Sequence, residues 1–162
     1  MRRFFLTFIL FALGGASAIA DDIFLQSESP VSHRHAVLED DGTIAYLYLT
    51  EPGSIRPVRD AVAYTRLAPA AKADPEQRRG NSEPAPLTAA VASGAAVIAT
   101  PDAAEFSFVW AADGESVALL RSGQPLALST AGEKLGYSKA VRTASALAHP
   151  WSEERFRELF GR

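Results

Sequence analysis

The first half of the chain has a hydrophobic pattern typical of a β-hairpin. Strands are predicted at 33–38 and 43–50, and the acidic run between them ends in Asp41-Gly42. Asp-Gly readily adopts the positive φ angles of a tight turn between twisted strands. Residues 44–49 are apolar at both odd and even positions, which indicates a central strand covered on both faces. A third strand is predicted at 61–67.

The second half contains the clearest alternation. Phe106, Phe108 and Trp110 are spaced two apart, as expected for one face of a strand. Two further apolar runs follow, separated by turn residues. We therefore predict an antiparallel meander with strands at 106–110, 117–121 and 125–129, and turns at 113–114 and 122–124.

The C-terminal residues predict a short amphipathic helix at 151–160. Ser152 is a suitable N-cap, Gly161 ends the helix, and aromatic residues such as Phe156 would dock it on the sheet. The expected fold class is therefore α+β: a mainly antiparallel sheet, made of a hairpin plus a meander, with a C-terminal helix packed on it.

Two segments between these elements are less regular. Residues 68–86 contain four prolines and little to bury, so a mobile insertion is expected there. The Ala-rich segment 87–100 is interrupted by Gly94, and its residues favour helix and strand almost equally. A short helix followed by a strand at 96–99 is the preferred interpretation.

The N-terminus has the three parts of an export signal. Arg2 and Arg3 precede an apolar run at 4–13, which is followed by small residues and by Ala18-Ile19-Ala20. We predict a signal peptide at 1–20, cleaved after Ala20, and a single α+β domain at 21–162. The general secretory route is favoured, and the adjacent arginines leave the twin-arginine route open. The expected location is periplasmic or secreted, without membrane insertion after cleavage.

Composition excludes several chemistries. The chain has no cysteine, so disulfides, thiolate catalysis and thiolate metal sites are ruled out. Residues 1–20 contribute two arginines and no acid, so the remaining chain carries a net charge of −5. An acidic surface argues against nucleic acid as a partner. No phosphate-loop or dinucleotide spacing occurs, and no cofactor is expected.

His33 and His35 are the candidate metal ligands. Two residues apart on a strand, they would point to the same face and could present two imidazoles to one ion. A third ligand would have to come from His149 or a carboxylate. The alternative is a pair of histidines on a solvated strand edge. No serine nucleophile motif is present, and catalytic residues are not predicted.

Aromatic residues are numerous for so small a domain, and most are expected in the core. Those that emerge on one sheet face would be interface anchors, because tyrosine and tryptophan combine a large rigid area with a polar tip. The interface candidates are Tyr46, Tyr48, Trp110 and Tyr137.

Several short motifs follow one another along the chain: Leu38–Thr43, Tyr46 and Tyr48, Val109-Trp110 before Asp113-Gly114, Val117–Leu120, Gly136-Tyr137 and Trp151. In this order they resemble a family of small uncharacterised bacterial domains. The resemblance covers most of residues 33–160. It implies a compact α+β domain and carries no activity.

Two functions from different classes are consistent with these features. The first is an exported, non-catalytic interaction protein of the bacterial cell envelope, in the manner of an inhibitor or immunity factor, with another protein as partner. The alternative is a periplasmic metal- or small-ligand-binding domain that uses His33 and His35. A small hydrolase is the least favoured reading.

Overall fold

The computed structural model describes residues 22–72 and 87–161. The predicted export signal and most of the predicted insertion lie outside these residues. The strands and helices are β1 (Ile23–Glu28), β2 (His35–Asp40), β3 (Ile44–Thr50), β4 (Pro57–Thr65), the 3-10 helix η2 (Ala103–Glu105), β5 (Phe106–Trp110), β6 (Ser116–Arg121), β7 (Gln124–Thr130), β8 (Tyr137–Ser138), β9 (His149–Pro150) and α1 (Glu153–Phe160).

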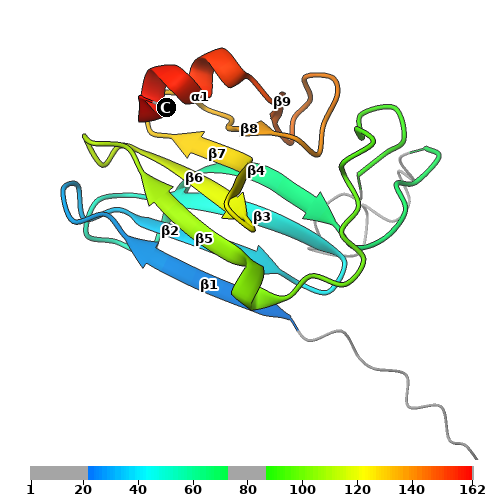
Figure 1. The fold of residues 1–162 in the computed structure, drawn as a ribbon, viewed down its shortest axis with the longest axis horizontal. Coiled ribbons are helices and arrows are strands. Elements are labelled where there is room, and N and C mark those ends of the chain that lie inside the picture. Colours follow the sequence, from blue (N-terminus) through cyan, green and yellow to red (C-terminus); the bar gives the residue numbers. More distant parts are fainter. Residues whose placement is uncertain (1–21, 73–86, 162) are drawn as a thin grey trace, which may run out of the picture.

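The strands form two sheets, with orders β1-β2-β3-β4 and β5-β6-β7-β8-β9. All neighbours are antiparallel except β8 and β9. Figure 1 shows β5 and β6 in front of the first sheet, with α1 beyond β7. The predicted α+β class, with an antiparallel sheet and a C-terminal helix, is confirmed. The hairpin and the meander belong to separate sheets, and β1 was not predicted.

The main core lies between the two sheets. Leu38 and Leu47 from the first sheet meet Val117 and Leu119 from the second, and all four are fully buried. Alternation directs the other side of β6, including Leu120, toward α1, where Phe156 packs against it. Each sheet therefore uses one face for the shared core, and the helix covers the outer face of the second sheet.

A buried ion pair joins the end of β2 to the residue after β4. Asp40 and Arg66 expose 0% and 5% of their side chains. The Arg66 Nε donates to both Asp40 carboxylate oxygens, at 3.0 and 2.8 Å, and the Tyr64 hydroxyl donates to Oδ2 at 2.5 Å. A buried charge requires such partners. The cluster therefore holds the end of β2 against the end of β4.

The two sheets also meet at one side through the segment before β8. The Gly136 N–H donates to the Asp60 carbonyl of β4 at 2.9 Å, and Leu135 forms a parallel bridge with Asp60. Gly136 lies between β4 and β7, against Ala61 and the Leu128 carbonyl. The absence of a side chain at this position permits the close approach.

The prediction of a short helix within 87–100 was wrong. Residues 87–100 form turns with isolated bridges, one of them at Val97. Some of their N–H groups bond to distant segments: Ser93 to the Ala140 carbonyl at 2.8 Å and Ile98 to the Thr65 carbonyl at 2.9 Å. These long-range bonds replace the local ones of a helix, because tertiary context overrides a weak propensity.

The C-terminal helix was predicted within two residues at its start. Ser152 accepts a hydrogen bond from the Arg155 N–H, and Gly161 adopts φ 65° after Phe160.

Within the described residues, no helix has the length and apolarity needed to cross a membrane.

Candidate functional site

The outer face of the first sheet is divided into a covered part and an open part. Over Tyr46 and Val62, the Ala-rich segment 87–98 and residues 140–148 pack as a second apolar cluster. Toward β1 and the start of β2, the face is bordered by Ile55 from the loop between β3 and β4. A groove with a volume of about 490 Å³ occupies the open part.

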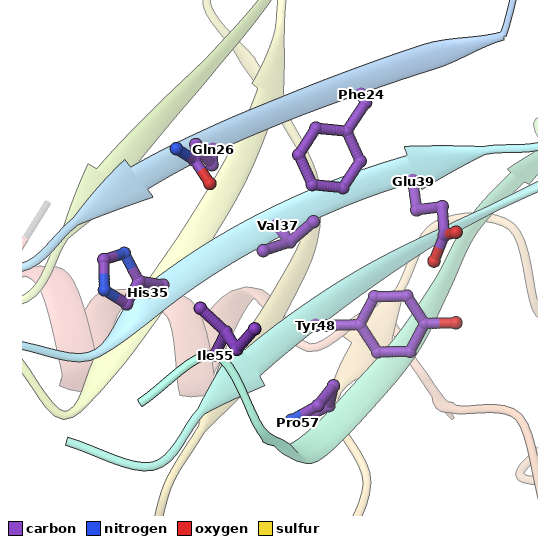
Figure 2. Close-up of a pocket in the computed structure, with 8 residues that line it drawn as sticks. All are labelled: Phe24, Gln26, His35, Val37, Glu39, Tyr48, Ile55 and Pro57. Atoms are coloured by element: carbon purple, nitrogen blue, oxygen red, sulfur yellow. The ribbon is translucent and has the colours of Figure 1, made fainter. Parts of the chain in front are cut away.

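The groove is built by alternation on three strands. Its lining residues are Phe24, Gln26, His35, Val37, Glu39, Tyr48, Ile55 and Pro57 (Figure 2). In the register, Gln26, Val37 and Tyr48 form one row across β1, β2 and β3, while Phe24 and Glu39 form the next row. Side chains two apart on a strand share a face, so the sheet places these groups on one surface.

Two apolar residues of this groove are unusually exposed. Phe24 exposes 63% of its surface, and Ile55, which comes from the loop between β3 and β4, exposes 86%. Figure 2 shows Phe24 and Ile55 on the same face of the sheet as Val37. Large apolar side chains gathered on one open face mark an interaction surface.

The structure brings the two candidate metal ligands near one carboxylate, but not onto one strand. His33 precedes β2 in a turn with φ 57°, so the expectation of two histidines on one strand face was wrong. The His33 Nδ1 lies 3.0 Å from Glu28 Oε1, and His35 is the cross-strand neighbour of Glu28. The hydrogen bond with His33 lowers the pKa of Glu28. Across residues 22–72 and 87–161, no three histidine or carboxylate groups are placed to hold a metal ion.

The four interface candidates have different surroundings. Tyr48 lines the groove, where its ring lies 5.9 Å from that of Tyr46. Tyr46 itself is only 7% exposed beneath the covering segments. The Trp110 Nε1 donates to Ser27 Oγ at 3.0 Å between the two sheet edges, and the Tyr137 hydroxyl donates to Glu133 at 2.7 Å. Sequence reasoning missed Phe24 and Ile55, since neither belonged to a predicted strand.

Three tyrosines predict a loss of stability at high pH. Burial raises the pKa of Tyr48 to about 12, and it also raises the pKa values of Tyr46 and Tyr64. Above pH ~10 the unfolded chain releases these protons while the folded chain keeps them. The contribution of these tyrosines to the free energy of unfolding is therefore expected to be constant below pH ~10 and to fall above it by about 1.4 kcal/mol per pH unit for each tyrosine that stays protonated.

Urea unfolding at a series of alkaline pH values would measure this slope. A Tyr46→Phe variant serves as the control, because its slope should lack the contribution of Tyr46 and keep those of Tyr48 and Tyr64. Equal slopes for the wild-type and variant proteins would contradict the assignment to Tyr46.

Comparison with known proteins does not assign a family. No protein-family model, curated protein or solved structure matches the chain. The resemblance to small bacterial domains remains a prediction. The function must therefore be inferred from the groove and its surroundings.

Proposed function

We propose that the chain is an exported, non-catalytic interaction protein of the bacterial cell envelope, and that it binds another protein through the groove on its first sheet. The observation that carries this proposal is the open sheet face with Phe24 and Ile55 exposed beside Tyr48. Apolar anchors next to a tyrosine are the composition of binding hot spots. An inhibitor- or immunity-like role agrees with a rigid two-sheet scaffold that presents such a face.

The surrounding chemistry supports binding over catalysis. Besides Tyr48, whose pKa is raised by burial, the titratable groups in the groove lining are His35 and Glu39. Among the described residues, neither side chain shares a hydrogen bond with a serine or threonine hydroxyl. A nucleophile with a general base needs that contact.

The alternative of a periplasmic metal- or small-ligand-binding domain has less support. Glu28 is the carboxylate next to both His33 and His35, and His33 already bonds to it; among the described residues no third ligand joins them. Binding of a protein, by contrast, accounts for the exposed apolar residues Phe24 and Ile55.

Replacement of the two exposed anchors tests the proposal. A library of random short peptides displayed on phage would be selected on the wild-type protein and on a Phe24→Ser/Ile55→Ser variant. We expect peptides to be enriched on the wild-type protein and lost on the variant. Both side chains are exposed, so the change in the free energy of unfolding should stay within about 1 kcal/mol, the span of strand propensities.

A matched control replaces apolar residues that are exposed outside the groove. Val31 and Leu67 expose 60% and 58% of their surfaces. A Val31→Ser/Leu67→Ser variant should retain the selected peptides. Peptides that bind the Phe24→Ser/Ile55→Ser variant as well as the wild-type protein would refute the proposed role of the groove.

A further inference from the structure

The groove has an uncompensated negative charge at one end. Its lining contains the Glu39 carboxylate and no lysine or arginine. Glu39 is exposed, and within the described part of the chain it belongs to none of the ion pairs. Figure 2 shows its carboxylate extending toward Tyr48. A partner that covers this end would bury an unpaired carboxylate unless it supplied a cation.

The electrostatic environment of Tyr48 also indicates an uncompensated negative charge at this end of the groove. After burial, the causes that raise the pKa of its hydroxyl are the negative charges of Glu39, Asp60 and Asp41, and no cation is among them. Asp60 lies opposite Tyr48 on β4, and partial burial raises the pKa of this carboxyl. Lys134 lines the hollow beyond Tyr48, on the Asp60 side. The side of the Tyr48 ring toward Glu39 therefore remains negative.

An aromatic ring beside a carboxylate suits a guanidinium or ammonium group. The ring face attracts a cation through its quadrupole, and the carboxylate accepts charge-assisted hydrogen bonds from it. Arginine fits best, because its planar guanidinium can stack on the ring and bond to the carboxylate together.

The other end of the groove suits an apolar side chain. Val37 and Ile55 line this end, whereas Phe24 is the cross-strand neighbour of Glu39 and flanks the acidic end. Val37 and Glu39 are two residues apart on β2, which separates the apolar end from the acidic end by roughly 7 Å. In an extended peptide, side chains two residues apart have the same spacing and the same direction.

We propose that the groove recognises an extended protein segment with an apolar side chain and an arginine or lysine two residues apart. The apolar group packs against Val37 and Ile55, and the cation lies on Tyr48 beside Glu39, with Phe24 on the other side of Glu39. This inference rests on the proposed binding function and specifies the chemistry of its partner. A second copy of the chain is a poor occupant, because it would bring a further net negative charge, −3 for the full sequence, to an acidic face.

The peptides selected on the wild-type protein provide the test. We expect enrichment of arginine or lysine two positions from a leucine, isoleucine or phenylalanine. For a synthetic peptide of this type, Glu39→Gln should weaken binding about three- to five-fold, the value of one exposed ion pair. The loss should shrink as salt is raised.

Glu154→Gln is the matched control, since Glu154 is equally exposed but lies on α1, away from the groove. It removes the same charge and should leave the affinity within two-fold by the same reasoning. Selected peptides that depend on Phe24 and Ile55 but carry no basic residue, or that bind equally after Glu39→Gln, would overturn the inferred partner chemistry and leave the binding function standing. A selection that yields no peptide dependent on Phe24 and Ile55 would overturn both.

Discussion

Replacement of Asp40 by alanine is expected to lower the free energy of unfolding by about 3–5 kcal/mol, the cost of removing one partner of a buried ion pair. The Asp40 carboxylate is fully buried and accepts hydrogen bonds from the Arg66 guanidinium and the Tyr64 hydroxyl. Its loss removes the buried counter-ion that the Arg66 guanidinium contacts through Nε. Urea unfolding followed by tryptophan fluorescence would measure the change.

A less buried ion pair of the same type, in which the Arg34 side chain is 14% exposed, is the control. Arg34 and Glu115 are joined at 2.9 Å, but the Glu115 side chain is 41% exposed. Glu115→Ala should therefore cost no more than about 1 kcal/mol. Similar losses for Asp40→Ala and Glu115→Ala would show that burial does not govern the strength of the Asp40 pair.

Elements whose folding is decided locally could be predicted from the sequence. Asp41-Gly42 and Asp113-Gly114 marked two hairpins, because glycine reaches the positive φ angles that these turns use, here 86° and 73°. The helix ends followed from Ser152 and Gly161 for the same local reason.

Elements that depend on distant partners were predicted less well. Residues 87–100 have almost equal helix and strand propensities, and their hydrogen bonds to Thr65 and Ala140 decide the outcome. Strand β1 begins soon after the apolar residues 4–20, so its short alternation could not be separated from them by pattern alone. Strand order and sheet partition are tertiary properties of the same kind.

The groove could be predicted only in part. The parity of residues 35, 37 and 39 places them on one face of a strand, and Tyr48 was already a candidate anchor. Which end of that face stays open depends on where the covering segments 87–98 and 140–148 dock. Ile55 belongs to a loop without hydrophobic periodicity, so its position at the groove could not be predicted from the sequence.

The junction between the sheets should be as sensitive as the buried ion pair. A Cβ atom added at Gly136 would overlap the carbonyl oxygen of Leu128 and lie 2.9 Å from the Ala61 Cβ. Ala61 and Leu128 are fully buried in β4 and β7, so neither side can yield without moving a strand. Gly136→Ala is therefore expected to lower the free energy of unfolding by about 3 kcal/mol, the upper end of the usual cost of overpacking.

Gly94→Ala is the control for this prediction, because a Cβ atom there meets no other atom within 4 Å. Its free energy of unfolding should stay within about 0.5 kcal/mol of the wild-type value, as for other surface substitutions. The groove lies on β1–β3 and Gly136 beyond β4, so Gly136→Ala should also leave peptide affinity unchanged wherever the protein remains folded. Wild-type stability in Gly136→Ala would mean that β4 and β7 separate easily at this point, and that other contacts between the sheets, such as the shared core around Leu38 and Leu119, set the stability.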